Sequence, residues 1–506
     1  MAFRQGHSRN RTPRGTSPTS GERRSIPSSP PAGSRERLLL TVSAGHLVFL
    51  PWALATVHPW SQIISLGFAL ISAGVAFVPV RHPPDRLEGP SAGSRLLRSP
   101  FFWLGAAVLV VILIQALNPA WRVTRDHQSW WLEPLPHLAW LPRGVDAPFD
   151  QSNPWRLLVI LGSVGLQAAA IGFGFKRRGS FHLLGAVLVG NAALLALLGL
   201  LQGLTGTNRI FWEYAPSNDS FVSSFIYRNH AGAYFNLMVA LAAGLAWWHF
   251  RQAHRTHAKS SPAALLAVIA TGVGALVGYS ASRMSIVNLL AFLGLTALAI
   301  AARRLRRRRH VFPRADLVVL ALMLVGAAGV TTLCLQVEKV RVRFLHLVED
   351  PQASAQDRII AGKASVEMLL ESWPTGWGAG CFRHGFPLYA VQHPEIYLSR
   401  LNVQRYWEYA HNDPLQFAIE FGLFGVLPLA LLFALVLARL WRVRFWRSVV
   451  SFSLVLAVGL LILHSTVDFV LQNPAILHTA AFLLIASIRW IELEPNAAPL
   501  RSGSGI

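Results

Sequence analysis

The sequence has few cysteines, few charged residues and few acids. Of its 506 residues only 2 are Cys and 14% are charged, and 24 Asp and Glu stand against 46 Lys and Arg. Cys334 and Cys381 match neither a metal site nor a disulfide framework, so we expect both to be unpaired. A soluble protein of this size is usually about a quarter charged, so the shortage of charge excludes an ordinary soluble domain. A repeat of fixed period is also missing.

Apolar residues are abundant instead. They form 53% of the chain, in recurring runs that are long enough to cross a membrane. A helix of about 20 residues spans a hydrocarbon core roughly 30 Å thick. The sequence therefore predicts an all-α integral membrane protein with about twelve transmembrane helices. The predicted spans are 38–57, 61–80, 101–117, 156–175, 181–204, 231–250, 262–279, 284–302, 315–336, 415–438, 448–470 and 473–491.

The spans divide the chain into five parts. Residues 1–36 are rich in Ser, Pro, Gly and Arg, and we expect a disordered cytoplasmic tail. A cleavable signal peptide is not expected, because the first apolar run begins late and lacks a small-residue cleavage site. A membrane domain with the first nine spans covers 37–336, and a periplasmic loop covers 337–414. The last three spans cover 415–491, and 492–506 form a second cytoplasmic tail.

The positive charge is distributed unevenly along the chain. The net charge of +22 and the basic run 303–309 could indicate nucleic-acid binding, but this run lies between two predicted spans. If the spans alternate and the N-terminus is cytoplasmic, the cytoplasmic segments hold 31 of the 46 Lys and Arg. The positive-inside rule expects this bias. We therefore predict a bacterial inner-membrane protein with both termini in the cytoplasm and no nucleic-acid partner.

Three substantial segments face outward in this topology, at 118–155, 205–230 and 337–414. They are rich in tryptophan, which suits either an aromatic belt at the headgroups or ring faces that stack on sugars. Composition does not separate these two interpretations. The tryptophans concerned are Trp121, Trp130, Trp131, Trp140, Trp212, Trp373, Trp377 and Trp407.

The long outer segment is predicted to contain a helix over 353–373. Its apolar residues recur at the spacing of one helical face, and Pro374 and three glycines end it. The glycines, in a GxGxG string, follow a helix and have no βαβ context, so we interpret them as a tight turn rather than a nucleotide-binding loop. The predicted apolar face consists of Val366, Leu369, Leu370 and Trp373.

Two arginines stand at the outer ends of spans. Arg228, with Asn229 and His230, directly precedes the sixth span, and Arg283 lies in the tight outer link between the seventh and eighth. Either arginine alone could extend to the headgroups. The positive-inside rule disfavours arginine on this side, however, which makes both candidates for function.

A histidine precedes the tenth span. Asp413 is expected to be the N-cap of this helix, with Pro414 at N1 and Gln416 at N3. His411 then lies just before a helix N-terminus, where the macrodipole disfavours an imidazolium and favours a proton acceptor. A purely structural loop histidine is the alternative. Glu420, about two turns into the span, requires a partner or a polar cavity.

Asp468 completes the set at the outer end of the eleventh span. It could pair with an outer arginine, orient His411, or simply cap or pack a helix. A pyrophosphate leaving group requires cationic, bidentate donors, and an acceptor hydroxyl requires a general base. No metal cluster is apparent in the sequence. The first outer loop, at 58–60, contains no acid, which argues against metal-dependent membrane oligosaccharyltransferases.

These residues, in this order, resemble the superfamily of O-antigen ligases and Wzy-type polymerases, which are glycosyltransferases of the bacterial envelope. The resemblance covers residues from roughly 200 to 480. Met284 stands where the family often has glycine, and Ala361 and Gly362 replace a common aromatic position. The matching motifs are Arg228-Asn229-His230, Ser282-Arg283, Arg358, Pro374 with Gly376-Trp377-Gly378-Ala379-Gly380 and Phe382, His411-Asn412-Asp413 with Leu415-Gln416, Glu420, Gly422 and Gly425, and His464 to Phe469.

The resemblance implies a GT-C-like membrane fold with a large helical periplasmic loop. It implies transfer of a glycan from an undecaprenyl-pyrophosphate-linked donor to a glycan or lipid acceptor at the periplasmic face. The anomeric carbon would be inverted, and no metal or other cofactor would be required. Both ligases and polymerases fit this description, and the sequence does not choose between them.

The same resemblance implies roles for individual residues. Arg228 and Arg283 would be catalytic and would hold the pyrophosphate, and His411 would activate the acceptor hydroxyl. Asp468 would support the substrate site. Arg358, Asn229, His230 and Asn412 are further predicted substrate-binding residues.

Two other functions remain open on the sequence alone. A transporter or flippase of lipid-linked glycans also commonly has twelve spans, although its ionisable residues should lie near mid-membrane. A non-catalytic assembly subunit would use the aromatic outer segments to bind glycan.

Overall fold

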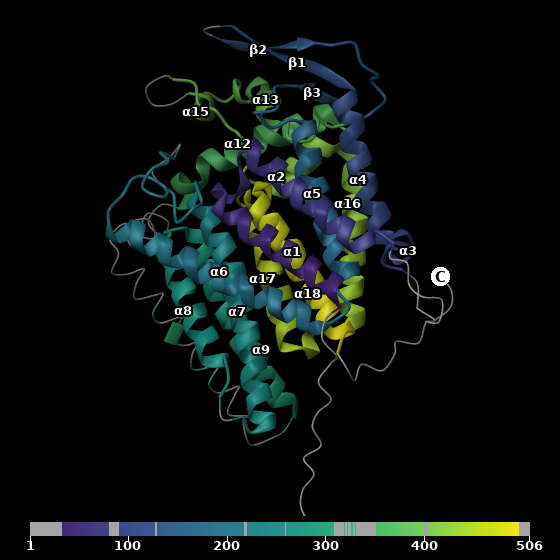
Figure 1. Cartoon of the computed structure of the whole chain (residues 1–506). Coiled ribbons are helices and arrows are strands. Elements are labelled where there is room, and N and C mark those ends of the chain that lie inside the picture. Colours follow the sequence, from purple (N-terminus) through teal and green to yellow (C-terminus); the bar gives the residue numbers. More distant parts are fainter. Residues whose placement is uncertain are drawn as a thin grey trace, which may run out of the picture.

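A computed structural model of the chain describes residues 33–79, 91–126, 129–216, 220–258, 260–307, 351–398 and 403–494, with isolated positions between 307 and 351. The predicted ninth span and Cys334 fall in that sparsely described stretch, and most of both predicted tails lies outside the described residues. The described chain is mostly helical (Figure 1).

Within the described part of the chain, eight helices are long and apolar enough to cross a membrane. This supports the predicted class of polytopic membrane protein. Two further predicted spans correspond to shorter apolar helices, α8 (Ala263–Tyr279) and α17 (Val449–Ser465), and the first corresponds to α1 (Ser34–Trp52). The eight helices are α2 (Pro59–Phe77), α4 (Pro100–Leu117), α5 (Pro154–Gly174), α6 (Arg178–Leu204), α7 (Arg228–Thr256), α9 (Arg283–Arg307), α16 (Asp413–Val443) and α18 (Pro474–Glu492).

The first helix begins earlier than the sequence predicts. We expected the tail to continue to residue 36, but α1 starts at Ser34. The reason is Glu36, which is buried and accepts hydrogen bonds from the backbone N–H groups of Lys176 and Arg177 at 3.0 and 3.2 Å. The Ser180 hydroxyl donates a third, at 2.6 Å. These partners belong to the start of α6, so an acid that looks like part of a polar tail anchors two helices.

Helix α7 is the central helix of the bundle. Of its apolar window 83% is buried, against 17% for α16. It packs against α8, α17, α6 and α9. A helix enclosed by protein on most sides holds its first residues in a fixed place, and those residues are Arg228, Asn229 and His230.

A small sheet forms within 118–155, a segment that we predicted to face outward without assigning it secondary structure. Strands β1 (Pro119–Arg125), β2 (Trp130–Pro134) and β3 (Gly144–Asp146) lie in the order β2-β1-β3, with β1 antiparallel to β2 and parallel to β3. The strands are short and rich in aromatic and polar residues, so their pattern does not stand out from that of a surface loop. The predicted all-α fold therefore needs this addition.

The sheet and the later outer segment pack together at one end of the bundle (Figure 1). We call the described residues of 118–153 and 351–411 the head. Trp121 of β1 stacks on Trp377, with 6.3 Å between the ring centroids, and Trp407 also packs into the core of the head. These three tryptophans are packing residues. Other outer tryptophans are exposed, namely Trp131, Trp140, Trp212 and Trp373.

Helix α12 (Pro351–Ser372) confirms the predicted outer helix, but most of its predicted apolar face is not the buried one. Leu370 is 71% exposed, and Val366 is exposed as well, whereas Ala361, Ala364 and Met368 are buried. Alanines let this side of the helix approach the rest of the head closely. Periodicity identifies a stripe of large apolar residues, but it does not show which stripe meets protein. Three four-residue helices follow, α13 (Phe382–Gly385), α14 (Pro387–Ala390) and α15 (Pro394–Tyr397).

The glycine string forms the predicted tight turn, and this turn enters a break in α16. At Gly422 the backbone of α16 leaves the helical conformation, with φ of +57°. A Cβ on Gly376 would lie 2.6 Å from the carbonyl oxygen of Glu420, so only glycine fits there. The Glu420 carboxylate accepts hydrogen bonds from the N–H groups of Gly380 and Phe382 at 2.9 and 3.2 Å. The acid therefore has the partner it was predicted to need, and the head is fixed to α16. Cys381, inside this turn, is buried and unpaired as predicted.

Candidate functional site

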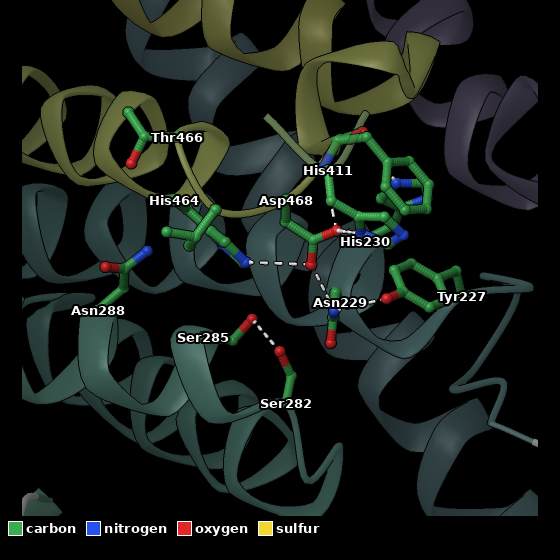
Figure 2. Close-up of polar contacts among 12 residues, drawn as sticks. Tyr227, Asn229, His230, Ser282, Ser285, Asn288, His411, His464, Thr466 and Asp468 are labelled. Carbon is green, nitrogen blue, oxygen red and sulfur yellow. Dashed lines mark hydrogen bonds and ion pairs between the residues drawn. The ribbon is translucent and has the colours of Figure 1, made fainter. Parts of the chain in front are cut away.

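The candidate site is organised around Asp468, in the link between α17 and the short helix η3 (Val470–Gln472). Its side chain is only 2% exposed. Figure 2 shows His411, His464 and Asn229 directed toward its carboxylate from three different elements. Residues that are far apart in the sequence therefore converge at the end of the bundle that carries the head.

Two neighbours of His411 fix the start of α16. The N-cap is Asn412, whose side-chain oxygen accepts a hydrogen bond from the Leu415 N–H at 3.1 Å. We predicted Asp413 as the N-cap, which is wrong by one residue. Asp413 is instead buried and accepts a hydrogen bond from the Leu471 N–H at 2.8 Å. This bond ties α16 to the link that carries Asp468, and Asn412 has a structural role in addition to any contact with substrate.

The backbone of His411 is in the left-handed region, with φ of +52°. This conformation is uncommon for a residue other than glycine, and it often marks a functional position. It directs the imidazole toward Asp468, and the edges of the rings of Phe469 and Trp407 pack against it at centroid distances of 4.8 and 5.8 Å. The side chain keeps 22% of its surface exposed. It is thus positioned by its neighbours and still accessible.

His411 and Asp468 form a hydrogen-bonded pair. Nδ1 of the histidine lies 3.3 Å from Oδ1 of the aspartate. An ionised carboxylate only accepts hydrogen bonds, so Nδ1 carries the proton and donates. In the neutral imidazole, Nε2 then carries a lone pair that can accept a proton from another group. Of the alternatives that the sequence left open for Asp468, the structure shows the contact with His411.

Three further groups contact the Asp468 carboxylate. The Phe469 N–H donates to Oδ1 at 3.0 Å, the Asn229 amide donates to Oδ2, and His464 Nε2 lies 3.8 Å from Oδ2. Burial raises the pKa of this carboxyl group, but the interactions with His411 and His464 outweigh burial and hold the pKa well below its usual range. Asp468 is therefore ionised at neutral pH and keeps the Nδ1–H tautomer of His411 in place.

Tyr227 adjoins the carboxylate and was not predicted as a site residue. Its hydroxyl oxygen accepts a hydrogen bond from the Asn229 amide at 2.8 Å, which leaves its own proton free to be donated elsewhere. Burial raises the pKa of Tyr227 to about 12, and the negative charge of Asp468 adds to this effect. The phenol is thus a donor at neutral pH. Its place one residue before Arg228 was the only signal in the sequence.

All three predicted arginines act on this phenol. The positive charges of Arg358, Arg228 and Arg283 each lower the pKa of Tyr227, against the effects of burial and of Asp468. Arg228 and Arg283 are the first residues of α7 and α9, and both are half-buried. Arg358, exposed on α12, donates a hydrogen bond to the carbonyl of Val467 at 3.0 Å. The three arginines are therefore close enough to Tyr227, beside the His411–Asp468 pair, for their charges to act on it.

His230 lies beneath the site. It is buried, and its Nε2 donates to the carbonyl oxygen of Phe469 at 3.2 Å. The ring of Phe469 meets it edge-on, with 5.0 Å between the centroids. In this position it supports the backbone next to Asp468, and its contact with substrate stays a prediction.

The arrangement has two chemical capabilities. A neutral histidine paired with a buried carboxylate can take a proton from a hydroxyl group. Guanidinium groups at the same place can bind and stabilise an anion such as a phosphate. Among the described residues, no group of three or more His, Cys, Asp or Glu is placed to hold a metal ion.

Residues 266–430 match the model of the family Wzy_C, described as O-antigen ligase. The matched part contains Arg283, Arg358 and His411, whereas Arg228 and Asp468 lie outside it. No curated protein matches the chain.

Proposed function

We propose that this chain, which belongs to the superfamily of O-antigen ligases and Wzy-type polymerases, transfers a glycan from an undecaprenyl-pyrophosphate carrier to an acceptor hydroxyl group. The reaction takes place at the periplasmic face of the bacterial inner membrane, where the head lies. The observation that carries the proposal is the contact of His411 with the ionised Asp468 beside three arginines.

His411 is the general base in the proposed reaction. Its Nε2 takes the proton from the acceptor hydroxyl, and the hydroxyl oxygen attacks the anomeric carbon of the glycan. The bond between that carbon and the pyrophosphate oxygen breaks, so the configuration at the carbon is inverted. Asp468 holds the imidazole in the required tautomer and stabilises the imidazolium that forms.

Arg228 and Arg283 bind the pyrophosphate and stabilise the negative charge that develops on it. Fixed guanidinium groups are suited to this work because each can donate two parallel hydrogen bonds to phosphate oxygens. Arg358 and the hydroxyl of Tyr227 are additional donors toward the same group. Since these groups neutralise the charge, the reaction needs no metal ion, and glycan transfer in washed membranes should be unchanged by EDTA.

The test of this function is the His411→Ala variant. Loss of a general base typically lowers a rate by about 10² to 10⁴-fold. We therefore expect glycan transfer from a defined lipid-linked donor to fall by at least the lower figure, at normal expression. His393→Ala is the matched control, because His393 lies in the same segment beside Glu367, away from Asp468. Undiminished transfer by His411→Ala would refute the mechanism.

One observation favours a second function, transport of the lipid-linked glycan. Inside the helix bundle a hydrogen-bonded chain joins His46, Ser65, Ser163 and His478, with successive distances of 2.8, 2.8 and 3.0 Å. Ionisable residues within the membrane are typical of transporters. Movement of a labelled carrier lipid across reconstituted vesicles, with no glycan product, would establish transport in place of transfer.

A further inference from the structure

Asp468 has a second histidine on the side opposite His411. His464 lies in the last turn of α17 and is fully buried, with Nε2 directed toward Oδ2 of the carboxylate at 3.8 Å (Figure 2). Neither ring nitrogen has a hydrogen-bond partner among the described residues. Buried polar groups in proteins are nearly always hydrogen-bonded, so these nitrogens require an explanation.

A small cavity lies beside His464, between α7, α9 and α17. The space open to the centre of a water molecule is about 10 Å³, which holds about one water. Asn236 and Asn288 line the cavity together with His464. Their amide nitrogens donate to the backbone carbonyls of Ser285 and Leu460, at 2.8 and 3.1 Å. Their side-chain oxygens, however, have no partner within the described part of the chain.

The chemistry of the lining identifies the occupant. A neutral histidine carries one N–H and one lone pair. If Nε2–H points at Asp468, Nδ1 of His464 is an acceptor. It joins the two amide oxygens as a third acceptor around the same cavity. A small molecule with two donor groups can satisfy two of these three acceptors, and the absence of a carboxylate from the lining residues disfavours a cation.

We infer that a water molecule occupies this cavity and, together with His464, positions Asp468 from the side opposite His411. The water donates to Nδ1 of His464 and to one amide oxygen, which fixes the tautomer with Nε2–H toward Oδ2. Oδ2 is then held by His464 and Asn229, and Oδ1 faces His411. This inference rests on the proposed function, because it makes His464 a positioning residue for the proposed general base.

Replacement of His464 tests this role. His464→Leu removes both nitrogens and should lower kcat by about tenfold, the effect of one lost hydrogen bond, with KM unchanged. His464→Gln keeps an amide N–H that can reach Oδ2 and should restore most of kcat. His384→Gln is the matched control, since His384 is also buried but is bonded through Nε2 to the Ser152 carbonyl in the head. It should leave kcat unchanged.

The water itself is tested by a cryo-EM map that resolves other buried waters. Density is expected between His464, Asn236 and Asn288, and it should be absent in Asn288→Leu, which removes one acceptor and fills the space. A dry cavity in the wild-type protein, or full kcat in His464→Leu, overturns the inference. These results differ from a failure of the proposed function. That function would fail only if the His411→Ala variant retained glycan transfer.

Discussion

Arg358 of the head donates a hydrogen bond to the carbonyl of Val467, the residue directly before Asp468, at 3.0 Å. The two residues are 109 positions apart in the sequence. The bond joins α12 to the link that carries the carboxylate. The position of the head over the membrane helices is therefore coupled to the group that orients His411.

Replacement of Arg228 or Arg283 by Lys should impair glycan transfer. A lysine keeps the charge but cannot form two parallel hydrogen bonds to phosphate oxygens. The loss of one such charge-assisted bond corresponds to a decrease of about 10 to 100-fold in kcat/KM. The measurement is product formation from a defined lipid-linked donor in membranes that contain equal amounts of each variant.

Arg209→Lys provides the comparison for these variants. Arg209 also lies in a segment predicted to face outward, and its guanidinium donates to the carbonyl of Glu213 at 2.9 Å. It should behave as wild type. Equal activity of all three lysine variants would contradict bidentate binding of the pyrophosphate.

Glu420→Gln should destabilise the protein. The carboxylate accepts hydrogen bonds from the N–H groups of Gly380 and Phe382, and an amide of the same shape would place an NH₂ group against one of them or weaken both bonds. We expect a loss of about 1–3 kcal/mol, measured as a lower unfolding midpoint in detergent. Glu408→Gln is the control, because its bond to Arg383 is at the surface and contributes less than about 1 kcal/mol.

Acid should destabilise the head through His384. Burial lowers the pKa of His384 from 6.5 to about 4, and the charges of Arg383 and Arg125 add to this effect. Between these two pH values the unfolded chain binds a proton that the folded head does not. Stability from this group is therefore complete above pH 6.5 and is lost as the pH falls toward 4, by roughly 3 kcal/mol in total.

Limited proteolysis of the head at several pH values measures this loss. His384→Gln cannot titrate, so the difference between wild type and variant isolates the contribution of this residue. If both proteins show the same pH dependence between 6.5 and 4, His384 is not the responsible group.

The predicted topology places the head in the periplasm. A reporter enzyme that is active only in the periplasm should be active when it is fused within 353–373. A reporter enzyme that is active only in the cytoplasm should be active when it is fused within 303–309. The physical reason is the excess of Lys and Arg in the segments that we assign to the cytoplasm. The opposite result at both positions would remove the basis for the proposed donor and acceptor.

The sequence predicted correctly which residues come together at the site. It was less successful in predicting the contacts that hold them in place. Because the spans alternate in direction, Arg228, Arg283, His411 and Asp468 all lie at one end of the bundle. The end of the bundle at which each residue lies can be predicted from hydropathy and charge alone. The support of these residues is less visible. A single residue separates Asn412 from Asp413, and both are good caps, so only the folded chain shows which one caps α16.

Other features depended on contacts that no local pattern contains. The buried side of α12 consists mainly of small residues, which a search for large apolar side chains overlooks. His464 lies inside an apolar run, and Tyr227 looks like an ordinary interfacial aromatic residue. Their roles can be recognised only in the folded chain, where Asp468 lies between the end of α17 and the start of α7.

The insertion of the glycine turn into the break of α16 has a consequence for exchanging parts between related proteins. Five hydrogen bonds join residues 374–382, which contain the turn, to residues 419–423 of the membrane helix α16. A head transplanted without these residues would lose its attachment, and His411 would lose its fixed geometry. A functional chimaera must therefore cross over beyond Gly425, within the second half of α16. The family match, which ends at residue 430, includes the whole of this attachment.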